Sequence, residues 1–294
     1  MQQPNKLRVA VAQIRTSLGD LRANLAKHLD VIEQARTRSV DLLMFPELSL
    51  TGYIPSEDTL SCAIRRSDPL VQEIADASGE MFTVFGCIEE GPGAQFHNAA
   101  FTVRNGKLIF LHHKLNLPNY GRLEESKYFA AGRYLETFDI VRPWRGSILI
   151  CADIWNPALV HLAAVHGSTV LLTPISSAEE AVGAEFDNPE GWTRCLSFYA
   201  MIYGMPIMVA NRVGLEGGLH FWGGSRILGP KGDVLAMSET ADEELLDVEF
   251  DYRELREARF RLPTVRDSNL DLILRETERL VQTVGVPPSV RRDL

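Results

Sequence analysis

The chain has 294 residues, of which 45% are hydrophobic, and its formal net charge is −9. A chain of this size can bury a large core in one or two domains, no apolar stretch is long enough to span a bilayer, and the acidic balance disfavours nucleic acid as a partner. Residues 1–6 lack an apolar signal core, so we expect a cytoplasmic protein that is not exported.

The first part of the chain predicts a βαβ opening followed by a strand hairpin. Apolar residues recur every three or four positions over 21–37, which indicates an amphipathic helix. Asn105-Gly106 predicts a tight hairpin turn, because this dipeptide tolerates positive φ angles. The expected elements are a strand over 7–14, the helix over 21–37, a strand over 40–46, a helix over 69–78, an extended segment over 82–89, and hairpin strands over 99–103 and 108–112.

A long polar loop over 115–134 interrupts this pattern, and a loop of that length in a compact domain is more often functional than idle. Strands and helices then alternate again. We expect a strand over 147–151, a helix near 157–166, a strand over 169–173, a helix near 190–203, a strand over 206–211 and a hairpin through Gly229-Pro230-Lys231-Gly232.

No linker or low-complexity segment divides the chain. We therefore expect one domain over 1–250 and a C-terminal extension over 251–294 that packs on the domain or on a dimer partner. The tail Val286-Pro287-Pro288-Ser289 cannot continue a helix, and we expect it to reach a neighbouring subunit.

Three chemically capable residues stand at the ends of predicted strands. Glu47 follows the strand over 40–46, Lys114 follows the hairpin, and Cys151 closes the strand over 147–151. α/β enzymes hold nucleophiles at such positions, and a strand-end glutamate suits a general base. Each residue alone also has an ordinary structural interpretation, namely a turn cap, a surface lysine and a small core residue.

The remaining cysteines and the histidines do not indicate a metal site. Cys62, Cys87, Cys151 and Cys195 form no CxxC pair, and the pair His112-His113 is not part of an HExxH pattern. We expect no metal, no cofactor and no disulfide framework. A reducing compartment would keep Cys151 usable as a nucleophile.

Taken together and in this chain order, the glutamate, lysine and cysteine resemble the catalytic triad of the nitrilase (carbon-nitrogen hydrolase) superfamily, and the resemblance covers nearly the whole chain. It implies an α/β fold, a four-layer α-β-β-α sandwich, and pairing through helices into a homodimer or a higher homo-oligomer. Its further marks are the segments Val9-Ala10-Val11-Ala12-Gln13, Ala210-Asn211-Arg212-Val213-Gly214 and Gly223-Gly224-Ser225-Arg226-Ile227-Leu228-Gly229-Pro230-Lys231-Gly232.

The resemblance assigns a role to each site residue. Cys151 attacks carbon, Glu47 takes the thiol proton and passes it to the leaving nitrogen, and Lys114 stabilises the oxyanion together with the backbone N–H of Ala152. Within this superfamily, the glutaminase domain of glutamine-dependent NAD synthetases places a supporting glutamate eleven positions after its lysine. In this chain that position is Glu125. Its neighbour Glu124 is the alternative, and an acidic pair on a solvated loop is the structural interpretation.

The substrate is indicated less sharply, because two resemblances compete. Residues 114–129 look most like the glutaminase domain of glutamine-dependent NAD synthetases, but Ala152 stands where that family has a glutamate. The segment 210–214 looks more like stand-alone amidases and carbamoyl-amine hydrolases. We expect cleavage of a small linear amide or carbamoyl amine. The alternatives are a nitrilase, an ammonia-supplying glutaminase subunit, and a non-catalytic binding or scaffold protein.

Five residues are candidates for contact with the substrate, because related amidases use the corresponding region or because aromatic side chains commonly line pockets. They are Tyr53, Tyr120, Trp155, Ser176 and Ser177. The aromatic residues are equally well explained as core. Glu185, Phe186 and Asp187 follow in a loop and are candidates for setting the charge of the bound head group, with no preferred sign.

Overall fold

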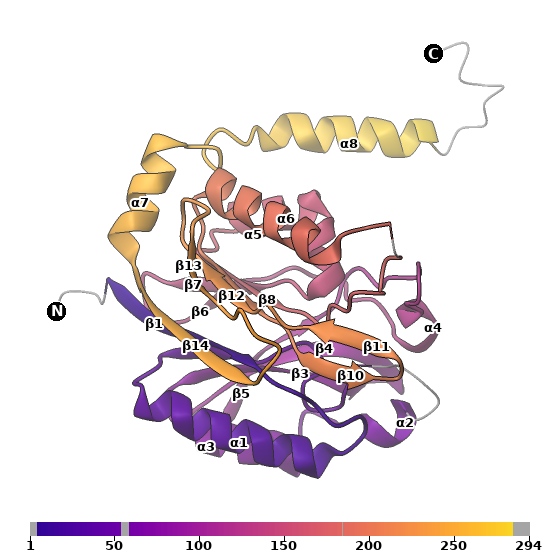
Figure 1. Cartoon of the computed structure of the whole chain (residues 1–294). Helices are drawn as coiled ribbons and strands as arrows, with labels where there is room; N and C mark the ends of the chain where they lie inside the picture. Colours follow the sequence, from indigo (N-terminus) through magenta and orange to yellow (C-terminus); the bar gives the residue numbers. More distant parts are fainter. Residues whose placement is uncertain (1–4, 54–58, 184, 285–294) are drawn as a thin grey trace.

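In the computed structural model, which describes residues 5–53, 59–183 and 185–284, two six-stranded mixed sheets lie face to face between two layers of helices (Figure 1). This arrangement confirms the expected four-layer α-β-β-α sandwich. The two halves of the chain supply one sheet each, with β14 returning from the second half to join the first sheet.

The first sheet has the strand order β14-β1-β2-β3-β4-β5. β1 and β2 run parallel with α1 between them, which confirms the βαβ opening. Asn105 and Gly106 join β4 to β5 with φ angles of 50° and 69°, so the expected turn is confirmed. The strands are β1 (Lys6–Gln13), β2 (Leu42–Met44), β3 (Phe82–Gly91), β4 (Gln95–Arg104), β5 (Lys107–His113) and β14 (Glu244–Asp251).

The second sheet has the order β13-β12-β9-β8-β7-β6, and its central strands β7, β8 and β9 are parallel. The expected hairpin through 229–232 is confirmed by antiparallel β12 and β13. The strands are β6 (Phe138–Asp139), β7 (Arg145–Ile148), β8 (Val170–Pro174), β9 (Ile207–Ala210), β12 (Arg226–Leu228) and β13 (Val234–Met237). A separate hairpin of β10 (Val213–Glu216) and β11 (Leu219–Trp222) was not anticipated from the sequence.

Helices cover the outer face of each sheet, and their ends carry the residues that helix termini require. Asp20 caps α1, Asp68 caps α3 and Asp187 caps α6, each by accepting a backbone N–H of the first turn. α1 and α3 lie on the first sheet and α5 and α6 on the second (Figure 1). The helices are α1 (Leu21–Thr37), α2 (Thr59–Cys62), α3 (Pro69–Ser78), α4 (Glu125–Tyr128), the 3₁₀ turn η1 (Cys151–Trp155), α5 (Pro157–Val165), α6 (Asn188–Tyr203), α7 (Tyr252–Arg261) and α8 (Leu270–Val284).

The alternation of side chains along β1 builds two cores at once. Leu7, Val9 and Val11 point into the core between the sheets, whereas Ala10 and Ala12 face the helix layer. Because both faces of this strand are buried, it is apolar throughout its central part. The inter-sheet core fixes the distance between the two sheets, and residues from both meet at its end.

Two strands that precede chemically capable residues end two or three residues earlier than the sequence indicated. The strands expected over 40–46 and 147–151 stop at Met44 and Ile148, so Glu47 and Cys151 are each the third residue beyond their strand. Pro46 cannot donate to a ladder, and the N–H of Ile150 is taken by a carboxylate of Asp153 at 2.9 Å. Glu47 therefore lies on a loop and Cys151 at the first position of η1, rather than at the last strand position.

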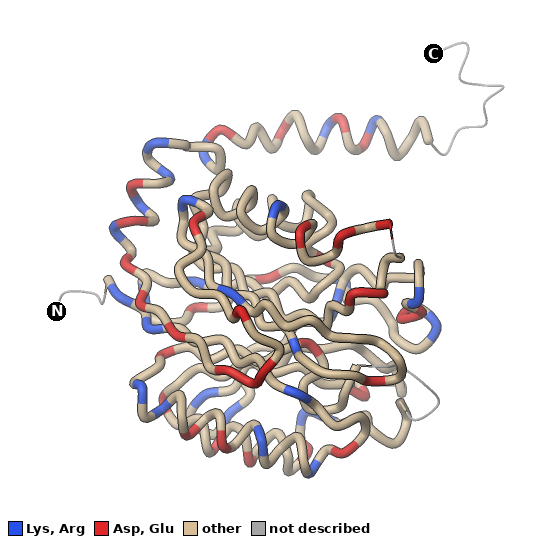
Figure 2. The backbone as a smooth tube through the Cα atoms, viewed as in Figure 1, with Lys and Arg blue, Asp and Glu red and all other residues tan. Residues whose placement is uncertain are grey.

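The segment for which a C-terminal extension was expected contains α7 and α8 as far as residue 284, and its division from the domain stays a prediction. In α8 no residue is buried, and charges of both signs alternate with exposed leucine, isoleucine and valine residues (Figure 2). The tail segment 286–289 lies outside the described residues, so its expected contact with a neighbouring subunit stays a prediction. Among the helices of the described ranges, none combines the length and apolar character needed to cross a membrane.

Candidate active site

Glu47 is positioned by a close approach of its loop to β3. Leu48 adopts a φ of 48°, and a Cβ added at Gly86 would lie 2.2 Å from the Leu48 nitrogen and 2.8 Å from the Glu47 carbonyl carbon. Only glycine leaves room for this contact. The Glu47 side chain is buried, and its Oε1 accepts a hydrogen bond from Asn98 Nδ2 at 2.8 Å.

Lys114 bridges two carboxylates in a fully buried cluster. Its Nζ lies 2.7 Å from Oε1 of Glu47 and 2.7 Å from Oε1 of Glu125, and all three side chains have zero exposure. The Tyr53 hydroxyl donates to the same Glu125 oxygen at 2.7 Å. The structure thus brings Glu125 to Lys114, as the eleven-residue spacing indicated, while Glu124 is 65% exposed.

The charges in this cluster determine the protonation of its members. Burial lowers the pKa of Lys114, but the negative charges of Glu125 and Glu47 outweigh it, so this pKa stays well above its ordinary value and the lysine is a cation. Burial raises the pKa of Glu125 to about 7, with Lys114 opposing and Glu47 adding to the rise. Within the described chain, Oε2 of Glu125 has no hydrogen-bond partner.

Cys151 opens the η1 turn with a φ of 45°, in the left-handed region that costs a non-glycine residue about 1–3 kcal/mol. Burial raises the pKa of its thiol well above the ordinary value, and the charge of Glu47 raises it further, whereas Lys114 lowers it. The resting thiol is therefore protonated at neutral pH. A nucleophilic role would require a base that accepts this proton during attack.

Asp153 ties the cysteine turn to the loop that follows Lys114, and the sequence reasoning gave it no role. Its buried Oδ1 accepts the backbone N–H groups of Leu115 at 3.0 Å and Asn116 at 2.7 Å, while Oδ2 accepts that of Ile150. One side chain thereby holds the Lys114 loop of the first sheet against the Cys151 turn of the second. Its position two residues after the cysteine was the only available signal.

The segment after β8 also meets the cluster. Ser176 donates from its backbone N–H to Oε2 of Glu47 and from its hydroxyl to the Glu47 carbonyl, both at 2.8 Å. The neighbouring Ser177 hydroxyl accepts from Asn188 Nδ2 and Trp192 Nε1, both at 2.9 Å, so this hydroxyl is engaged within the protein. The Ser176 contacts place that serine at the cluster, whereas the Ser177 hydroxyl binds side chains of α6. A contact with substrate stays a prediction for each.

The aromatic candidates lie in different surroundings. Tyr53 is buried within the cluster, whereas Tyr120 is 46% exposed and lies within electrostatic reach of Cys151 and Lys114. The Trp155 ring packs against Trp192 at 4.8 Å and Phe186 at 5.9 Å between centroids. Of the nearby loop, Glu185 is exposed and Asp187 serves as the cap of α6.

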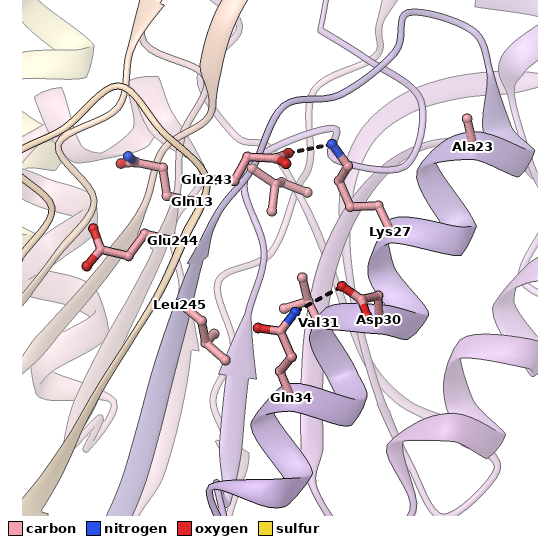
Figure 3. A pocket seen from close by; sticks show the side chains of 10 residues that line it. Gln13, Ala23, Lys27, Asp30, Val31, Gln34, Glu243, Glu244 and Leu245 are labelled. Atoms are coloured by element: carbon pink, nitrogen blue, oxygen red, sulfur yellow. Dashed lines mark hydrogen bonds and ion pairs between the residues drawn. The ribbon is translucent and has the colours of Figure 1, made fainter.

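A surface hollow of about 350 Å³ between α1 and the β1–β14 edge is separate from this cluster (Figure 3). Its Lys27 pairs with Glu243, and Gln34 donates to Asp30 at 2.9 Å, so these four polar side chains are engaged in two pairs. The described residues contain no group of three or more histidine, cysteine, aspartate or glutamate side chains arranged to hold a metal ion.

Comparisons with known proteins show the family of the chain. Residues 8–260 match the family model described as carbon-nitrogen hydrolase. A glutamine-dependent NAD(+) synthetase of Thermotoga maritima is 32% identical over 253 residues, which are 85% of this chain but 43% of that protein, so the chain spans less than half of this relative.

Two full-length similarities complete the comparison. An N-carbamoylputrescine amidase of Oryza sativa is 24% identical, with 90% of this chain and 93% of that protein covered. A mutant of an amidase from Nesterenkonia sp. AN1, with the acetamide moiety of fluoroacetamide added covalently at its active-site cysteine, has a TM-score of 0.73 and 27% identity, covering 87% of this chain and 95% of that chain.

Proposed function

Because the chain belongs to the carbon-nitrogen hydrolase family, we propose that it is a thiol hydrolase that cleaves a small linear amide or carbamoyl amine through a cysteine thioester. The observation that carries this proposal is the buried cation of Lys114 between the carboxylates of Glu47 and Glu125, within electrostatic reach of the Cys151 thiol. Buried charges are costly to a fold, and their concentration beside a thiol favours a catalytic use.

The first chemical step is attack of Cys151 on the carbonyl carbon. The S–H proton moves to Glu47 as the C–S bond forms, and the carbonyl electron pair moves onto oxygen. Lys114 stabilises that oxyanion, and the backbone N–H of Ala152, in the first turn of η1, donates a second hydrogen bond to it. A donor of this kind contributes roughly 3 kcal/mol to lowering the barrier.

The second step breaks the C–N bond. Glu47 returns its proton to the nitrogen, which leaves as ammonia or an amine, and a thioester remains on Cys151. Water then attacks the thioester while Glu47 again accepts a proton, and the thiol is released with the acid product. Glu125 accepts a second hydrogen bond from Lys114 and so keeps the cation in place through both steps.

Similarity to the amidases supports an amide or carbamoyl substrate. The covalent adduct of the Nesterenkonia amidase forms at a cysteine, and the N-carbamoylputrescine amidase matches this chain over nearly its full length. Glutamine hydrolysis is a second candidate, because the glutamine-dependent NAD(+) synthetase of Thermotoga maritima is 32% identical to this chain. Ala152 argues against it, since the glutaminase resemblance calls for a glutamate beside the cysteine. A nitrile is the third, because the same thiol can add to one.

The remaining parts of the proposal concern assembly and location. We propose a homodimer or a higher homo-oligomer, which the exposed apolar residues of α8 and of Phe198 and Met201 on α6 support. We further propose a reducing, cytoplasmic location, which would preserve the free thiols at Cys62, Cys87, Cys151 and Cys195.

The test is release of ammonia from a panel of glutamine, carbamoyl amines, short aliphatic amides, ω-amides of dicarboxylic acids and nitriles. Cys151→Ala should abolish turnover, and Cys195→Ala, which removes a partly buried thiol outside the cluster, should leave it unchanged. Turnover that survives in Cys151→Ala would refute the mechanism. Turnover of nitriles and of no other member of the panel would show that the protein is a nitrilase rather than an amidase.

A further inference from the structure

The segment Asn211-Arg212, a mark of the family resemblance to which the sequence assigned no role, is buried between β9 and β10. Arg212 is 1% exposed, and its guanidinium lies 4.4 Å from the ring centroid of Phe221. It forms a two-point pair with Glu216, with Nη1 to Oε1 at 3.2 Å and Nη2 to Oε2 at 2.5 Å. Both partners belong to the β10–β11 hairpin region, and Glu216 is buried as well.

Glu216 extends this pair toward the cluster. Its Oε1 accepts the backbone N–H of Tyr53 at 2.8 Å, although the two residues are 163 positions apart. Tyr53 in turn donates its hydroxyl to Oε1 of Glu125, the oxygen that also accepts from Lys114. A continuous set of charged and polar contacts therefore runs from Arg212 to the lysine.

From this geometry we propose that Glu216, held by Arg212, is a positioning residue that fixes Tyr53 and, through the Tyr53 hydroxyl, orients Glu125 and Lys114 for the proposed reaction. This inference rests on the proposed function and deepens it. Glu216 does not act on the reacting atoms. Its carboxylate supplies the acceptor that sets the Tyr53 backbone, and the two-point pair with the arginine holds that carboxylate in a single orientation.

The physical need for such a support follows from the chain around Tyr53. Lys114 is oriented by two carboxylates, and only one of them, Glu47, is fixed by Asn98 and by the Ser176 backbone. The other, Glu125, belongs to the single-turn helix α4 within a long loop. The hydrogen bond from the Tyr53 hydroxyl fixes the Glu125 carboxylate within this loop. Glu216 in turn fixes the Tyr53 backbone.

The test compares two variants that remove the buried charges equally. Arg212→Met with Glu216→Leu deletes the acceptor for the Tyr53 N–H, whereas Arg212→Met with Glu216→Gln restores it in a side chain of similar size. The rate of Cys151 alkylation by iodoacetamide, followed by peptide mass spectrometry, reports on the site without requiring a substrate. Alkylation of Cys195 and the melting temperature monitor the fold in each variant.

We expect the leucine variant to slow Cys151 alkylation about tenfold, and the glutamine variant to recover at least about a third of the wild-type rate. Tyr53→Phe should slow alkylation to a similar degree, and adding it to the leucine variant should cause little further loss. The acidic limb of the pH–rate profile should move to higher pH in the leucine variant, because the Tyr53 hydrogen bond lowers the pKa of Glu125. A purely structural role would not move this limb.

Several results would overturn the inference. One is a wild-type rate of Cys151 alkylation in the folded leucine variant. Another is a loss of rate that multiplies when Tyr53→Phe is added to that variant, because Glu216 would then act independently of the Tyr53 hydroxyl. A wild-type Cys151 that is no more reactive than Cys195 would instead overturn the proposed function, and this inference with it.

Discussion

Replacing Glu125 with glutamine tests the central electrostatic claim about the cluster. The substitution retains an oxygen that can accept from Tyr53 and Lys114, but it removes one of the two negative charges that hold the lysine at 2.7 Å. A hydrogen bond to a charged group contributes about 1.5–3 kcal/mol. At about 1.4 kcal/mol per tenfold in rate, we expect kcat to fall about 10- to 150-fold.

The folded state should tolerate this change. When Glu125 is ionised, Lys114, Glu47 and Glu125 together carry one excess negative charge in a buried site, and the glutamine variant leaves a balanced pair of Lys114 and Glu47. The matched control is Glu124→Gln, whose side chain is 65% exposed and which should leave both kcat and the melting temperature unchanged. A wild-type kcat in Glu125→Gln, or an equal loss in Glu124→Gln, would refute the reasoning.

The pH dependence of the same variant gives a second, independent measurement. Burial raises the pKa of Glu125 to about 7, so the carboxylate is ionised above and protonated below that pH. If the ionised form holds Lys114, wild-type kcat should rise as pH increases through about 7, and this limb should be absent in Glu125→Gln. Because the folded pKa exceeds the unfolded one, this group alone makes the fold less stable as pH rises from about 4.3 to 7.

Three further predictions address the surroundings of the cluster. At pH 7 iodoacetamide should modify Cys151 faster than Cys195, because a neighbouring carboxylate can take the thiol proton, and equal rates would contradict this. Gly86→Ala places a Cβ 2.2 Å from a backbone nitrogen, so it should lower the free energy of unfolding in urea by about 1–3 kcal/mol and remove most of the activity. Gly91→Ala on the same strand, whose Cβ would have its nearest neighbour at 3.4 Å, should change both quantities little. Burial raises the pKa of Glu89, but hydrogen bonds from a histidine and an arginine leave it below its ordinary value, so its contribution to stability is present above the unfolded pKa and is lost as pH falls. The free energy of unfolding should therefore fall less steeply in Glu89→Gln than in the wild type once the pH drops below about 4.3, the unfolded glutamate pKa, by up to about 1.5–3 kcal/mol, and an unchanged slope there would contradict it.

The sequence was sufficient for features encoded by neighbouring residues. The helix over 21–37 and the Asn105-Gly106 turn were predicted correctly, because periodicity and turn chemistry are local. The hairpin of β10 and β11 was missed, although its Gly217-Gly218 turn, with φ angles of 54° and 77°, offered the same kind of signal. β14 was missed because it is an edge strand that pairs with a partner at the opposite end of the chain.

The long-range contacts of the site could not have been derived in this way. The carboxylate of Asp153 binds backbone groups 37 and 38 residues earlier, and that of Glu216 binds the Tyr53 N–H. No periodicity or dipeptide encodes such a pairing, because it depends on how two sheets are placed against each other. The family pattern identified the candidate site residues, but it did not indicate which hydrogen bonds hold their loops in place.

That dependence on sheet placement has a physical consequence for the proposed activity. Glu47 and Lys114 follow strands of the first sheet, while Cys151 and Ser176 follow strands of the second. The apolar core between the sheets drives their association but is non-directional, so it cannot by itself set the positions of reacting atoms. The two Ser176 bonds to Glu47 and the Asp153 bonds after Lys114 are directional and cross between the sheets. They therefore fix the register of one sheet on the other, and the site can form only once both halves of the chain have docked.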